Sequence, residues 1–137
     1  MKIVIETIPH AQQRYATPGD WTSEIDQDGN WNARITVSEL PTKIALFPEK
    51  FAFLVAIHEL IEVALCREAG VSTEAVDEFD LHYAGSRDEP GDDDDAPYYA
   101  QHQFACGIER QLAAALGVDW DEYSEAVDAL GDTHAVE

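Results

Sequence analysis

The sequence has few basic residues, few cysteines and no long apolar run. Only 8 of its 137 residues are Lys or Arg, against 28 Asp or Glu, so the formal net charge is −20 at pH 7. This charge argues against direct binding to DNA, RNA or an anionic membrane surface, because all of these repel a polyanion. Cys66 and Cys106 are too few for a disulfide scaffold.

Segments that would export the chain or anchor it are also missing. Apolar runs free of charge, such as residues 51–57, fall far short of the roughly 20 residues that cross a bilayer. The first residues meet Glu6 and Pro9 before any signal-like apolar segment develops. We therefore expect a cytoplasmic protein. Because 45% of its residues are hydrophobic, we expect residues 1–137 to fold as a single domain.

The first forty residues carry β signals. Residues 2–8 are rich in β-branched side chains and predict a strand. Residues 21–25 and 31–37 flank a turn at Asp28-Gly29-Asn30 and predict a hairpin with one buried face. Between the strand and the hairpin, residues 10–20 have no regular period and predict a surface loop.

The period becomes helical from Pro48 to residue 130. Pro48 suits a first helical turn and Gly70 a helix end, which predicts a helix of about twenty residues. Ser72 or Thr73 can cap a second helix that ends near Gly85.

An acidic loop over residues 86–96 leads into a third predicted helix, which Gly117 ends. Asp119 and Glu122 form a capping-box start for a last helix, after which residues 131–137 should fray. The chain is therefore predicted to be α+β, with a strand and hairpin packed on three to four helices.

Residues 51–66, FAFLVAIHELIEVALC, contain the most informative pattern. Thirteen of these sixteen residues are apolar around the whole circumference, which predicts a central helix buried on nearly all sides. The three polar residues, His58, Glu59 and Glu62, fall within one arc of about 100°. Two buried carboxylates repel each other and lose hydration, so a proton or a cation must compensate them. The pattern predicts a divalent metal site.

The order His-Glu-x-x-Glu resembles the His-Glu-x-x-His helix of zincin metallopeptidases. The resemblance implies a zincin-like fold, with His58 and Glu62 as metal ligands and Glu59 as the general base that takes the water proton. It also implies a peptide or protein substrate lying along an edge strand before the helix. Glu62 replaces the second histidine and makes a harder, more anionic site, but zinc remains the expected metal.

A zinc site normally needs a third protein ligand. His102 is the first candidate, because it lies with Cys106 and Glu109 on one stripe of the third predicted helix. Asp80 is the next, since the second helix follows a tight turn at Gly70 and must pack near the first.

These features have plainer explanations as well. His58, Glu59 and Glu62 could form a solvated stripe, and His102 a core or surface histidine. The two cysteines are expected to be core thiols, and the acidic run 92–95 a solvated loop without a site.

A second interpretation also uses carboxylates. Glu59-x-x-Glu62 and Asp77-x-x-Asp80 are similar to the paired motifs by which all-helical nucleotide pyrophosphohydrolases hold magnesium. That family needs neither a histidine at position 58 nor a hairpin. A diphosphate substrate would also require basic residues to bind it, and this chain has few of them.

A third interpretation is an acidic inhibitor that imitates nucleic acid and binds a host protein. Residues 77–95 hold nine acids and one Arg, and residues 119–137 hold seven acids and no Lys or Arg. Such a surface could present a phosphate-like row to a DNA-binding partner, but strong acidity also simply keeps small domains soluble.

The chain as a whole resembles a group of small phage and prophage proteins. The resemblance lies in the segments QRYATPGDW, IHELIEVALC, VDEFDLHY, EPGDDDDAPYYAQH and IERQLAAALGVDW. It implies the cytoplasm of an infected bacterium as the compartment, without implying an activity.

Overall fold

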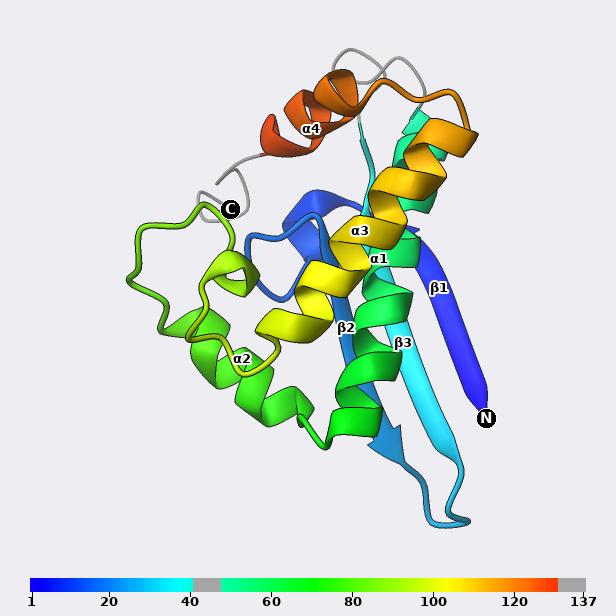
Figure 1. The fold of residues 1–137 in the computed structure, drawn as a ribbon. Helices are drawn as coiled ribbons and strands as arrows, with labels where there is room; N and C mark the ends of the chain where they lie inside the picture. Colours follow the sequence, from blue (N-terminus) through cyan, green and yellow to red (C-terminus); the bar gives the residue numbers. More distant parts are fainter. Residues whose placement is uncertain (41–47, 131–137) are drawn as a thin grey trace.

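A computed structural model describes residues 1–40 and 48–130 and has the predicted α+β architecture (Figure 1). Strands and helices follow one another as expected from the sequence, with two short 3-10 turns between them. In chain order the elements are β1 (Lys2–Ile8), η1 (His10–Gln12), β2 (Gly19–Ile25), β3 (Trp31–Ser38), α1 (Pro48–Ala69), α2 (Thr73–Leu81), η2 (Pro90–Asp92), α3 (Tyr99–Ala115) and α4 (Trp120–Asp128).

The three strands form one mixed sheet in the order β1-β3-β2. β2 and β3 form the predicted antiparallel hairpin, with Trp21 opposite Ile35, and Gly29 in its turn has a φ of 82°. β1 pairs with β3 in parallel. β3, the strand that immediately precedes α1, is therefore central, and β2 is an edge strand.

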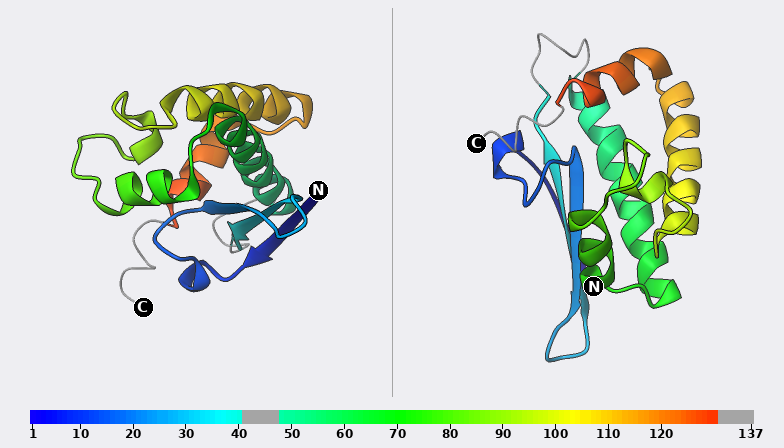
Figure 2. Two further views of the ribbon diagram at one scale, coloured as in Figure 1. Left: turned by 90° about the horizontal axis from the view of Figure 1, so that it is seen from below. Right: turned by 90° about the vertical axis from the view of Figure 1, so that its left-hand side faces the viewer.

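α1 forms the middle layer of the molecule, between the sheet and α3 (Figure 2). Ile35 and Val37 from the inner face of β3 are almost fully buried, as are Leu54 and Val63 of α1. The prediction that this helix is buried on nearly all sides is too strong, because Phe53 is 49% exposed. α3 covers one side of α1 and leaves a stripe of it open.

The predicted helix ends are largely confirmed. Gly70 adopts a φ of 74° just after α1, a conformation that glycine takes without steric cost. The Ser72 hydroxyl caps α2 by accepting from the amide of Ala75, and Asp119 caps α4 by accepting from the amide of Glu122. α2 ends at Leu81, one turn earlier than the predicted end near Gly85.

Residues 10–20 are not the simple surface loop that the sequence predicts. The segment starts with η1, and the Gln13 side chain that follows is buried against β3. Its amide group donates to the carbonyl of Thr36 and to the Ser38 hydroxyl, and its amide oxygen accepts from the Thr36 hydroxyl. Polar anchoring, which has no periodic sequence signal, folds this segment onto the sheet.

Two further predictions concern the ends of the chain and membranes. The predicted fraying of residues 131–137 lies outside the described residues. Within residues 1–40 and 48–130, no helix combines the length and the apolar character that a membrane span requires.

The layered core makes a prediction about stability. Leu54→Ala should lower the free energy of unfolding by about 2–5 kcal/mol, because it leaves a cavity at a fully buried position between sheet and helix. Phe53→Ala, one residue away on the half-exposed stripe, is the matched control and should cost clearly less. Urea denaturation of both variants measures the difference, and equal losses would contradict the layer assignment.

Candidate metal centre

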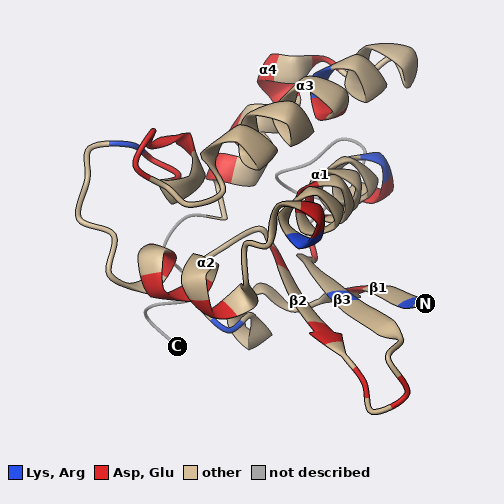
Figure 3. Cartoon of the chain, turned by 60° about the horizontal axis from the view of Figure 1, so that its bottom comes forward, with Lys and Arg blue, Asp and Glu red and all other residues tan. Residues whose placement is uncertain are grey.

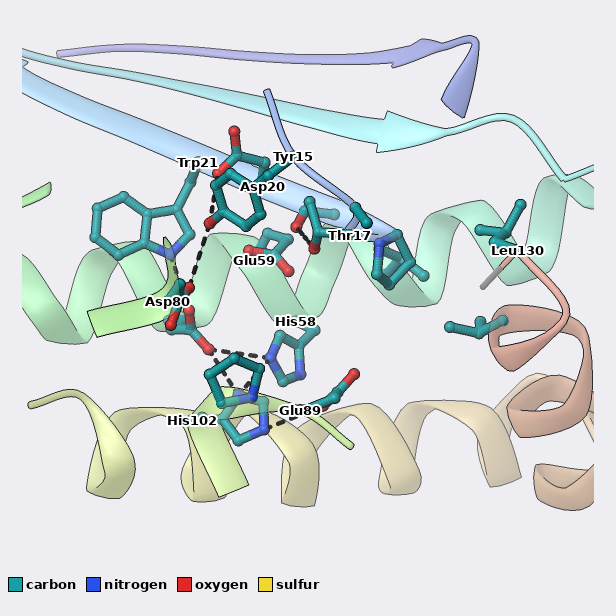
Figure 4. A pocket seen from close by; sticks show the side chains of 18 of the residues that line it. Tyr15, Thr17, Asp20, Trp21, His58, Glu59, Asp80, Glu89, His102 and Leu130 are labelled. Atoms are coloured by element: carbon teal, nitrogen blue, oxygen red, sulfur yellow. Dashed lines mark hydrogen bonds and ion pairs between the residues drawn. The ribbon is translucent and has the colours of Figure 1, made fainter. Parts of the chain in front are cut away.

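Three donor atoms from two helices converge inside the molecule. His58 Nε2 and Glu62 Oε2, one turn apart on α1, are 3.1 Å from each other. His102 Nδ1, from α3, lies 3.2 Å from His58 Nε2 and 2.9 Å from Glu62 Oε2. Tetrahedral zinc with bonds of about 2.0 Å separates its ligands by about 3.3 Å. The triangle therefore has nearly the size of one face of a zinc site. Figure 4 labels two of its members, His58 and His102.

The outer nitrogens of both imidazoles face carboxylates. His58 Nδ1 is 2.8 Å from Glu109 Oε1, while His102 Nε2 is 3.1 Å from Asp92 Oδ1 and 3.4 Å from Glu89 Oε2. A carboxylate only accepts, so each outer nitrogen carries a proton. If the rings are neutral, the inner nitrogen of each, His58 Nε2 or His102 Nδ1, then carries a lone pair. Both lone pairs point toward the lone pairs of Glu62. Three acceptors facing one another require added protons or a cation.

A second layer of hydrogen bonds fixes the carboxylates. The indole Nε1 of Trp21 donates to Glu62 Oε1 at 2.9 Å, which leaves Oε2 for the triangle. The Tyr123 hydroxyl donates to Glu109 Oε2 at 2.5 Å. Partners of this kind orient metal ligands in proteins and raise the basicity of ligating histidines. The site is thus held in one geometry from β2, α1, α3 and α4.

The electrostatics of the metal-free triangle show how strongly its groups interact. Burial opposes the charge on Glu62, but hydrogen bonds from His102 and His58 lower the pKa of this carboxyl to about 2. Burial likewise disfavours a charged His102, yet hydrogen bonds to Cys106, Glu62 and Glu89 raise its pKa to about 12. The pKa of His58 is raised well above its usual value by the same balance. In the metal-free protein, protons thus occupy the centre of the triangle, where a cation could bind.

Glu59 differs from its neighbours because it makes no hydrogen bond or ion pair with any described residue. Burial and the charge of Glu62 raise its pKa well above the usual range for a carboxyl. Figure 4 shows Glu59 between β2 and His58. Gly19 allows this approach, since a Cβ there would lie 2.8 Å from Oε1 of Glu59.

A cavity of about 500 Å³ opens beside the triangle. Its walls include β2, the segment before β2, α1, the loop before α3 and the end of α4. This volume is in the range of small-molecule or short-peptide sites. The three residues of the triangle line this cavity, and so does the carboxyl group of Glu59.

Asp80, the other predicted ligand, lines the cavity but stands apart from the triangle. Its Oδ1 accepts from the Tyr98 hydroxyl at 2.6 Å and its Oδ2 from the Tyr15 hydroxyl at 3.3 Å. Burial raises the pKa of Asp80 to about 6, against these two hydrogen bonds. Within the described residues it forms no ion pair with His58 or His102. Asp80 therefore belongs to the wall of the cavity and not to the triangle.

The four carboxylates of the pyrophosphohydrolase interpretation have different hydrogen-bond and ion-pair partners in the described residues, and that interpretation stays a prediction. Asp77 forms an ion pair with Arg14 at 2.8 Å, and Asp80 is held by tyrosines. Glu62 is occupied by the two histidines. The ion pairs of Glu62 therefore join it to the two histidines and not to the second acidic motif.

The cysteines take different positions. Cys66 is fully buried, as expected of a core thiol. Cys106 is only partly buried, and its Sγ lies 3.6 Å from His102 Nε2. Its sulfur and one nitrogen each of His58 and His102 lie within 4.8 Å of one another, so these three could also hold a cation.

Several members of the site have no recognisable signal in the sequence. Asp92, in the acidic run for which the sequence predicts no site, accepts a hydrogen bond from Nε2 of His102. Trp21 appeared only as a strand residue, and nothing in its local pattern signals a bond to Glu62 across 41 positions. The loop can approach because Gly91 lacks a side chain: a Cβ there would lie 2.7 Å from Cγ of His102.

Comparisons with known proteins add no family. No family model matches the chain. A search of curated proteins and a search of solved structures also returned no match. A function can therefore be inferred only from the geometry and chemistry of the site.

The carboxylate behind His58 gives a first test of the site. Glu109→Gln should weaken zinc binding by about 10- to 100-fold, because a neutral amide holds the imidazole less firmly than a carboxylate. Competition with a chelating dye measures the affinity. Glu125→Gln, at an exposed position on α4, is the control and should leave it unchanged. Equal affinity in all three proteins would show that Glu109 plays no part.

The low pKa of Glu62 predicts the acid stability of the metal-free protein. A carboxyl whose folded pKa lies below its unfolded value of 4.5 stabilises the fold above that pH, and this contribution is lost as pH falls toward about 2. Urea denaturation with chelator between pH 5 and pH 2.5 should show this loss. Glu62→Gln should show a smaller one, and an equally steep loss in the variant would contradict the ion-pair assignment.

Proposed function

We propose that this chain binds one divalent metal ion, zinc in the first place, through His58, Glu62 and His102. The observation that carries the proposal is the triangle itself, in which two imidazole nitrogens and one carboxylate oxygen lie within 3.2 Å of one another. Two histidines and one glutamate are the ligand set of several catalytic zinc sites, which leave one position for water. Outer carboxylates on both histidines complete a pattern common to metal ligands.

We further propose that the protein is a metal-dependent hydrolase of the peptidase type. A bound divalent metal supplies two things: it lowers the pKa of a water ligand and polarises a carbonyl group. In this chain Glu59 would accept the water proton, since its side chain lies next to the triangle and has no competing partner. The charge of a bound cation would favour the ionised carboxylate that this role needs, against the burial that favours the protonated form. The about 500 Å³ cavity gives a substrate access to both groups.

The edge position of β2 suits a peptide substrate. An extended peptide can add to a free strand edge through main-chain hydrogen bonds. The outer edge of β2 is occupied at Ser23, whose amide and carbonyl both bond to the Thr73 hydroxyl. Nearer its start β2 lines the cavity at Gly19, Asp20 and Trp21. The Gly19 carbonyl already accepts from the Thr17 hydroxyl at 2.6 Å, so we assign the substrate main chain to Trp21.

Two other predictions from the sequence stay open beside this proposal. An acidic inhibitor that captures a host nucleic-acid-binding protein would need no metal, and salt-sensitive capture of such a protein by metal-free chain would favour it. The kinship with phage proteins, and the bacterial cytoplasm as compartment, remain predictions.

Metal content tests the first part of the proposal. Protein purified without added metal should contain about one divalent ion per chain, and His58→Ala should lose it, because a zinc site rarely survives with two protein ligands. Elemental analysis measures both. His82→Ala, which removes an exposed histidine just after α2, is the control and should keep the ion. Absence of any metal from the wild type near neutral pH would refute the metal site.

Turnover tests the second part. Glu59→Gln should retain zinc but lower kcat on a cleavable peptide by at least about 100-fold, since the amide cannot accept the water proton. Glu68→Gln, at the exposed end of the same helix, should keep full activity. A zinc-loaded protein that cleaves no peptide in a diverse library would reduce the site to a structural one.

A further inference from the structure

The cavity beside the triangle is strongly anionic. Eight of its lining residues are Asp or Glu and none is Lys or Arg. A divalent cation would offset two of these charges, and neutral imidazole ligands add none. The acidic lining residues are Asp20, Glu59, Glu62, Asp80, Asp88, Glu89, Glu109 and Asp128.

Several of these carboxylates already have partners. Glu62 and Glu109 bond to histidines, and Asp20 forms an ion pair with Arg14 at 2.7 Å. Asp88 and Asp128 make no hydrogen bond or ion pair through their side chains within residues 1–40 and 48–130. Both are exposed at the rim of the cavity, so a substrate can reach them.

The rim carboxylates come from separate elements and lie close enough to repel one another. Asp88 and Glu89 belong to the loop before α3, and Asp128 is the last residue of α4. Partial burial and the charges of Glu89 and Asp88 raise the pKa of Asp128. The last turn of α4 also has no basic residue to balance the negative end of the helix dipole. A cationic group at this rim would offset both the repulsion between the carboxylates and the negative end of the α4 dipole.

We infer that the pocket selects a cationic substrate: a peptide with a lysine or arginine side chain close to the bond to be cleaved, bound at Asp88 and Asp128. This inference rests on the proposed function and names its substrate class. Acidic residues also cover α2, α4 and the loop before α3, the elements around the cavity (Figure 3), and they would steer such a peptide toward it. Anionic substrates would be repelled by the same charges.

Two labelled peptides that differ in one residue test the inference. One carries lysine and the other norleucine, which keeps the hydrocarbon stem and removes the charge. Fluorescence anisotropy with zinc-loaded protein at low salt should give a Kd at least about tenfold lower for the lysine peptide, and mass spectrometry checks that both peptides remain intact. Added salt should reduce the preference, because rim charges are screened.

Matched double variants separate the rim from the overall charge. Asp88→Asn with Asp128→Asn should reduce the preference to about threefold or less. Glu24→Gln with Glu68→Gln changes the net charge equally at exposed positions outside the cavity and should leave the preference intact. Equal loss in both double variants would assign the effect to the whole molecule and overturn the inference.

The remaining outcomes keep the two proposals apart. If zinc is retained but both peptides bind equally, or neither binds, the substrate inference fails while the metal site stands. If the wild type holds no zinc, the proposed function fails, and the lysine and norleucine peptides still test charge selection on the metal-free protein.

Discussion

The structure depends on one electrostatic constraint: two imidazole nitrogens and one carboxylate oxygen face one another in the interior, and protons or a cation must lie between them. Each imidazole is committed through its outer nitrogen to a carboxylate, so its inner nitrogen offers only a lone pair unless it gains a second proton. The carboxylate between them cannot supply that proton while it is charged. Burial makes this arrangement costly when nothing positive is added. The indole, phenol and carboxylate groups around it hold the geometry in place despite that cost.

The order of the secondary structure could be read from the sequence because it depends on local signals. Pro48, Gly70, Ser72 and Asp119 mark helix ends by their own chemistry, and the alternation around Gly29 marks the hairpin. The parallel pairing of β1 with β3 has no such local mark. The folding of Gln13 onto the sheet likewise depends on single hydrogen bonds that no period announces.

The candidate site likewise contains residues that local sequence signals indicate and residues that they do not. His58, Glu59 and Glu62 stand out because polar residues are rare within an apolar helix, and His102 follows from its stripe on α3. Asp80 was predicted from helix proximity, and the structure places it in the cavity wall with two phenols. Asp92 and Trp21 could not be found beforehand, since each meets its partner only through tertiary packing.

The two helices that supply the donor atoms also have a mechanical relation. His58 and His102 are separated by 44 positions, so an ion shared between them would close a long loop of chain, comprising α2 and the acidic segment before α3. Closing such a loop reduces the conformational freedom of the unfolded chain and favours the folded one. Occupancy would then set how readily α3 separates from α1, and the same ion would act as a clamp between these two helices.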